Sequence, residues 1–144
     1  MARTENKSAD KVKFRFYYAA AASLGALSVA LGAFGAHALR GIISEPALAT
    51  FNTGTRYQMI HAVVLLVAIR FAEDTSSKWF LGAARLLLIG IVLFSGSLYG
   101  LVLLHWNFLG PVTPLGGASL IAGWVFLTIG FLKPPIHAGR ESSH

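Results

Sequence analysis

The stretch "LLLIGIVLFSGSLYGLVLL", residues 86–104, holds 19 consecutive residues without a charged side chain. As an α-helix it would extend about 28 Å, because each residue adds about 1.5 Å. That length is close to the hydrocarbon thickness of a bilayer, about 30 Å, and uncharged runs of about 18 residues or more are typical of membrane spans. The stretch therefore predicts a transmembrane helix and, with it, the class of fold.

Three further segments predict transmembrane helices. Residues 16–39 contain no charged side chain, and neither do residues 115–132. The remaining segment, 55–71, contains Arg56 and Arg70 near its ends. Long arginine stems allow the guanidinium groups to reach the membrane interface, so this segment is also compatible with a span.

The spans divide the chain into three parts. We predict a basic N-terminal tail over residues 1–15, a transmembrane domain over 16–132 and a polar C-terminal tail over 133–144. Between the first two spans, "SEPALATF" begins with residues typical of a helix start. We expect an interfacial helical segment there, over about 44–53, with a break at Gly54. Since the links are short, neighbouring helices should be antiparallel, which predicts an all-α fold, an integral membrane four-helix bundle.

Composition and charge agree with a membrane protein. The chain is 55% hydrophobic and only 12% charged, whereas soluble domains carry about 25% charged residues. Ten of the 12 Lys and Arg residues fall in the two tails, in the link between the second and third spans or, as Arg70 does, at the end of the second span that adjoins this link. This asymmetry predicts both termini on the cytoplasmic or matrix side of a bacterial plasma (inner) membrane or an organellar inner membrane. It also accounts for the net charge of +6 without nucleic acid as a partner.

Small residues recur at every fourth position in three of the predicted spans. Such stripes allow close approach of helices in lipid, where apolar side chains alone give no preference for a helix neighbour. They serve either packing within one bundle or contact with a second copy or another subunit. The candidate packing residues are Ser28, Gly32, Ala36, Gly96, Gly100, Ser119 and Gly123.

Polar side chains in or beside the spans form one candidate cluster. All of them fall in the predicted outer half of the membrane or at its outer surface, because the first and third spans run outward and the second runs inward. An ionisable group within a span is costly and suggests a function; His61 is the deepest of the histidines. The candidates are His37, Arg56, Tyr57, His61, Tyr99 and His105.

Four interpretations of His61 stay open. Its imidazole could bond a neighbouring group and fix the register of the helices. It could ligate haem or a metal together with a second histidine, although no carboxylate supports such a site. With Tyr99 it could hydrogen-bond a quinone or relay protons. It could also line a path for a small solute.

Signatures of enzymes are missing from the sequence. None of the predicted spans contains Asp or Glu, and the chain has no cysteine, which excludes disulfides and thiolate sites. Phosphate loops, nucleophile elbows and metalloprotease motifs are also missing. We therefore predict no catalytic residue, no metal ligand and no cofactor.

The favoured function is that of a non-enzymatic accessory or assembly subunit of a membrane complex, or a homo-oligomer. The alternatives are a quinone- or haem-binding redox protein and a small-solute transporter or channel.

Four stretches together resemble a known family of small membrane proteins. They are "LGAFGAHAL" at 31–39, "FNTGTRYQMIHAVVLL" at 51–66, "FSGSLY" at 94–99 and "TPLGGASLIAGW" at 113–124. In this combination and order the chain resembles the uncharacterised inner-membrane proteins of the YgdD and YwdK type, which have mitochondrial relatives. The resemblance implies a compact four-helix membrane fold. It covers the positions of His37, Tyr57, His61 and Tyr99 but implies no role for them.

Overall fold

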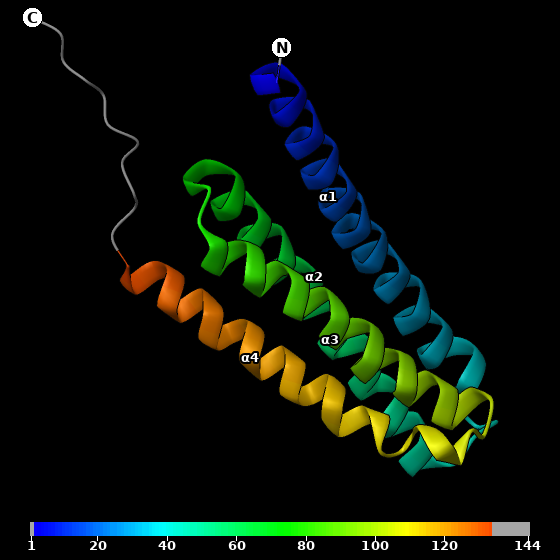
Figure 1. Cartoon of the computed structure of the whole chain (residues 1–144). Coiled ribbons are helices and arrows are strands. Elements are labelled where there is room, and N and C mark those ends of the chain that lie inside the picture. Colours follow the sequence, from blue (N-terminus) through cyan, green and yellow to red (C-terminus); the bar gives the residue numbers. More distant parts are fainter. Residues whose placement is uncertain (1, 134–144) are drawn as a thin grey trace, which may run out of the picture.

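The computed structural model describes residues 2–133, and this part of the chain forms four long α-helices (Figure 1). The helices are α1 (Ala2–Phe34), α2 (Glu45–Thr75), α3 (Lys78–Leu103) and α4 (Val112–Leu132). A π-helical turn, η1 (Gly35–Leu39), continues α1, and a 3-10 turn, η2 (Asn107–Leu109), precedes α4. Residues 2–133 contain no strand, so the predicted all-α class is confirmed.

All four helices are long and apolar enough to cross a membrane. The candidate spans are Lys13–Leu39, Glu45–Thr75, Lys78–Leu103 and Asn107–Leu132. The shortest of them has 26 residues, about 39 Å at about 1.5 Å per residue, which exceeds a bilayer core of about 30 Å. The predicted integral membrane fold is therefore confirmed.

The helices extend beyond the predicted boundaries. Helix α2 runs without interruption from Glu45, so the expected break at Gly54 does not occur. The glycine serves packing instead, because a Cβ at Gly54 would lie 2.8 Å from Cε1 of Tyr99. Helix α1 begins at Ala2, within the predicted N-terminal tail. The predicted C-terminal tail lies outside the described residues from position 134 onward.

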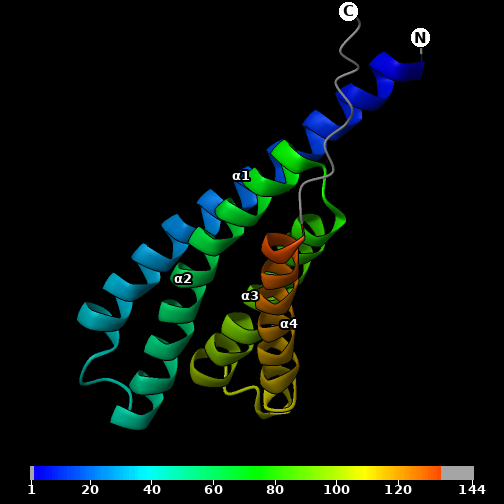
Figure 2. The ribbon, with the colours of Figure 1, turned by 90° about the vertical axis from the view of Figure 1, so that its left-hand side faces the viewer.

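Each helix packs chiefly against the next one in the sequence: α1 against α2, α2 against α3, and α3 against α4. Figures 1 and 2 show α1 beside α2 on one side of the assembly and α4 beside α3 on the other. The start of α1 and the end of α4 lie at the same end of the molecule (Figure 1), which we call the terminal end. The opposite end, where the links 40–44 and 104–111 lie, we call the loop end.

Glycines bring α3 and α4 into close contact. A Cβ at Gly90 of α3 would lie 2.9 Å from the backbone nitrogen of Leu120 on α4. A Cβ at Gly123 of α4 would lie 2.9 Å from Cγ of Leu87 on α3. Because neither position has room for a side chain, the two helix backbones approach as small residues permit in membranes. Leu87 and Leu65 of α2 are fully buried in the core beside this contact.

Candidate functional site

Buried polar side chains lie between the middle of the molecule and the loop end. They belong to six residues: Ser28, Thr55, Gln58, His61, Ser95 and Ser97. Together with Tyr99 and Trp124, which bond to two of them, we call these residues the polar layer. Within the described side chains, no buried nitrogen or oxygen atom lacks a hydrogen-bond partner. Every buried polar side-chain atom of the layer therefore has a hydrogen-bond partner, as buried polar groups require in an apolar medium.

One turn of α2 accepts hydrogen bonds from both neighbouring helices. The Ser28 hydroxyl of α1 donates to the carbonyl oxygen of Thr55 across 2.7 Å. The Ser95 hydroxyl of α3 donates to the carbonyl oxygen of Gly54 across 2.9 Å. Because these carbonyls are adjacent, α1 and α3 are both held in register against the same turn.

Gln58 joins three helices through its amide group. The Tyr99 hydroxyl of α3 donates to Oε1 of Gln58 across 2.9 Å. Nε2 of Gln58 donates to the carbonyl oxygen of Leu24 on α1 across 2.8 Å. Gln58 is only 2% exposed, so this chain of two bonds crosses the interior from α3 to α1.

His61 has both ring nitrogens engaged. Nδ1 lies 2.7 Å from the carbonyl oxygen of Tyr57, and Nε2 accepts from Nε1 of Trp124 on α4 across 3.3 Å. A carbonyl only accepts and an indole N–H only donates, so the proton is assigned to Nδ1 and the imidazole is neutral. His61 thus connects α2 to α4, and neither nitrogen is left for another partner without breaking a bond.

Tyr57 lies at the surface of the polar layer. Its side chain is 41% exposed. The ring centroid lies 4.7 Å from that of Phe94 and 5.6 Å from that of His61. Tyr57 therefore covers His61 on the side that faces the bilayer.

The other candidates of the predicted polar cluster are dispersed. His37 lies exposed in η1, His105 lies exposed after α3 with φ of 56°, and Arg56 is exposed on α2. Among the described side chains, none of these three bonds to His61. The described residues also contain no group of three or more His, Cys, Asp or Glu that could hold a metal ion.

The predicted packing residues divide into two groups. Ser28, Gly100, Ser119 and Gly123 face a neighbouring segment: Ser119 donates to the carbonyl oxygen of Leu86 across 2.8 Å, and a Cβ at Gly100 would collide with Leu109. At Gly32 and Gly96, in contrast, an added Cβ would meet no atom within 4 Å, and Ala36 is exposed. The second group faces outward.

Five members of the polar layer were missed by reasoning from the sequence: Thr55, Gln58, Ser95, Ser97 and Trp124. For Gln58 a signal existed, because an uncharged amide within a span must find a partner in lipid. For Trp124 no comparable signal existed, since tryptophan in a membrane helix is typical of apolar or interfacial positions.

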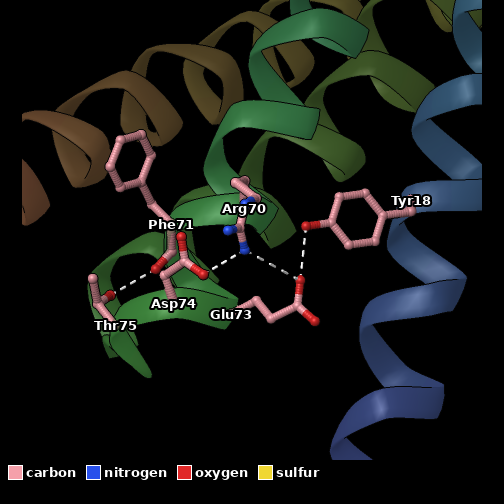
Figure 3. A network of polar contacts seen from close by, with 6 residues as sticks. All are labelled: Tyr18, Arg70, Phe71, Glu73, Asp74 and Thr75. Atoms are coloured by element: carbon pink, nitrogen blue, oxygen red, sulfur yellow. Dashed lines mark hydrogen bonds and ion pairs between the residues drawn. The ribbon is translucent and has the colours of Figure 1, made fainter.

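A separate polar network lies toward the terminal end (Figure 3). The Tyr18 hydroxyl of α1 donates to Oε2 of Glu73 on α2 across 2.9 Å. Arg70 forms an ion pair with Asp74 and lies 3.9 Å from Glu73. In Figure 3 the ring of Phe71 points away from Tyr18 and from Glu73.

These features define a small α-helical integral membrane protein whose buried polar groups connect its helices. The chain belongs to the family described as "Protein of unknown function (DUF423)", which residues 31–117 match. It is 40% identical over 119 residues to the UPF0382 inner membrane protein YgdD of Escherichia coli K12, covering 83% of this chain and 91% of YgdD. It is 43% identical over 108 residues to the UPF0382 membrane protein YwdK of Bacillus subtilis, covering 74% and 88% of the two chains. No solved structure matches.

Proposed function

We propose that this protein is a non-enzymatic subunit that acts through helix–helix contacts in a larger membrane complex. The family describes membrane proteins of unknown function, so the proposal rests on the molecule itself. Its main support is the outer surface of α1, which has one principal helix neighbour, α2.

The side of α1 that points away from α2 is made of alanines. At about 100° per residue these positions fall on one face, opposite the face that carries the buried residues Ala21 and Ser28. We call this row the alanine face; its members, all exposed, are Ala19, Ala22, Ala26, Ala30 and Ala33. A helix that contacts only lipid gains nothing from small side chains, whereas a second helix can approach them closely. The alanine face is therefore suited to a transmembrane helix of a partner protein.

The polar layer supports a structural role for the candidate residues rather than a chemical one. Haem or metal ligation by His61 requires a free imidazole nitrogen, and both nitrogens are engaged. A quinone at Tyr99 requires its hydroxyl, which already donates to Gln58. Each bond joins different helices or caps a backbone carbonyl, so its loss would loosen the helix contacts on which docking of a partner depends.

The test is copurification from gently solubilised native membranes. We expect the wild-type chain to migrate with a second membrane protein, and Ala26→Leu and Ala30→Leu to lose that protein because leucine keeps the helices apart. Ala118→Leu is the matched control, since Ala118 is an exposed alanine on α4. Migration of the wild-type chain alone, as a monomer or as a homo-oligomer, contradicts the proposal. So does retention of the partner by both α1 variants.

A further inference from the structure

A pocket opens at the terminal end, where α2 ends, α3 begins and α4 ends. Its volume is about 520 Å³. Phe71, Phe80 and Phe131 line it from three different helices, and Lys78 and Lys133 line its rim. The pocket thus combines an apolar wall with cationic groups, and it is separate from the polar layer.

The three phenylalanines form a contiguous wall. The ring centroids of Phe71 and Phe80 lie 5.2 Å apart, those of Phe71 and Phe131 4.9 Å, and those of Phe80 and Phe131 5.0 Å. Gly130 permits this closeness, because a Cβ there would lie 2.8 Å from Cε1 of Phe80. Phe131 and Phe71 remain 56% and 38% exposed, so the wall is open to an apolar ligand.

Both lysines lie beside the ring of Trp79, which also lines the pocket. Nζ of Lys133 lies 4.3 Å and Nζ of Lys78 lies 5.7 Å from the centroid of the same indole ring, that of Trp79. Lys78 is also the first residue of α3, whose first turn contains no acidic residue. Since the N-terminus of a helix carries partial positive charge, a lysine there is unfavourable unless an anion compensates it.

Among the described residues, the two carboxylates near the end of α2 have other partners. Glu73 accepts from Tyr18, and Asp74 pairs with Arg70. Neither Glu73 nor Asp74 lines the pocket, and in Figure 3 the ring of Phe71, which does line it, points away from Glu73. The charge of the rim is therefore complementary to an external anion.

The geometry points to a binding site for an anionic phospholipid, with its phosphate between Lys78 and Lys133 and an acyl chain along the phenylalanine wall. A lipid would contact both the phenylalanine wall and the two lysines, whereas a soluble phosphate would leave the aromatic wall exposed. The pocket also lies at helix ends, the level at which lipid headgroups meet a spanning protein. Basic residues at this level attract anionic headgroups.

The test is native mass spectrometry of the delipidated full-length protein in detergent, titrated with dioleoyl-phosphatidylglycerol or dioleoyl-phosphatidylcholine. We expect the protein to retain phosphatidylglycerol in preference to phosphatidylcholine. Lys78→Gln and Lys133→Gln should each weaken phosphatidylglycerol binding about fivefold, the effect of one lysine near an anionic headgroup. Arg85→Gln is the matched control: it removes one exposed charge of α3 outside the pocket, and binding should stay within about twofold.

Three results would overturn the inference. They are equal retention of phosphatidylcholine, unchanged phosphatidylglycerol binding by the double variant K78Q/K133Q, and a loss in Arg85→Gln as large as in the lysine variants. Displacement of the lipid by millimolar inorganic phosphate would assign the site to a soluble anion instead. Lys133→Arg, which keeps the charge, should bind as the wild type does, and the melting temperature of each variant separates loss of binding from loss of fold.

Discussion

Nε1 of Trp124 on α4 donates a hydrogen bond to Nε2 of His61 on α2 across 3.3 Å. This bond links two helices that are not principal packing neighbours, since α3 is the main partner of each. It also occupies the nitrogen that a haem or metal site would have required. The residue with the strongest sequence signal for chemistry is thus part of the packing of the helices.

Removing the indole donor should destabilise the protein modestly. Trp124→Phe leaves Nε2 of His61 buried without a donor, and we expect a loss of about 1 kcal/mol of unfolding free energy. Trp106→Phe is the control, since Trp106 is similarly exposed, 49% against 46%, and lies outside the polar layer. Equal losses in both variants, measured by denaturant unfolding in detergent, would show that the bond contributes nothing.

The tautomer of His61 can be observed directly. Nitrogen NMR of labelled protein should show Nδ1 protonated and Nε2 unprotonated, because Nδ1 faces the carbonyl oxygen of Tyr57. In Trp124→Phe the shift of Nε2 should change while that of Nδ1 stays. A proton on Nε2 in the wild type would refute the assigned network.

Gln58 and Tyr99 should behave as a coupled pair. Tyr99→Phe leaves Oε1 of Gln58 without its donor, and Gln58→Leu leaves the Tyr99 hydroxyl without its acceptor. We expect each single variant to lose about 1–2 kcal/mol. The double variant should lose about 1 kcal/mol less than the two single losses together, because one interaction is removed in all three. Strict additivity in a double-mutant cycle would argue against this bond.

Two glycines of α3 should respond oppositely to alanine. At Gly90 a Cβ would lie 2.9 Å from the backbone nitrogen of Leu120, so Gly90→Ala must push α4 away at a cost of about 1–3 kcal/mol. At Gly96 a Cβ meets nothing within 4 Å, so Gly96→Ala should leave stability unchanged or raise it slightly. Thermal unfolding of both variants in the same detergent is the comparison. A large loss at Gly96 would indicate a contact with another molecule at that face.

Added haemin should not acquire ligation by His61 in the wild-type protein. Both nitrogens of His61 are engaged, so ligation would cost at least one buried hydrogen bond. Titration followed at the Soret band should give the spectrum of non-specifically bound haemin, equal in wild type and His61→Ala. A ligated spectrum that His61→Ala abolishes would restore the redox alternative.

The membrane class and the four spans were predictable from the sequence because the bilayer imposes a local requirement. A run such as residues 86–104 must remain uncharged over its whole length wherever its neighbours lie. The same requirement identified His61 as costly, and it could have identified Gln58. Helix limits were less predictable. The bilayer excludes charged residues from its core, but charged residues can still be part of a helix, and both α1 and α3 include such residues.

The roles of the polar residues became clear only from the packed helices. The partner of Gln58 on α1 lies 34 positions away and the partner of His61 on α4 lies 63 positions away. Which side chains meet over such separations depends on how the helices are rotated and offset, and many small-residue stripes permit similar packing. For the same reason Ser28 and Gly32, four residues apart on one predicted stripe, differ in the structure: Ser28 bonds to α2, and Gly32 faces open space.

Membrane insertion thus follows from the order of the residues alone, because burial in lipid acts on each segment separately. The order of the residues does not determine which hydrogen-bond partners the buried polar groups find. It also does not determine which helix faces stay exposed for a partner or a lipid. Both depend on the relative placement of whole helices, which a short stretch of sequence does not specify.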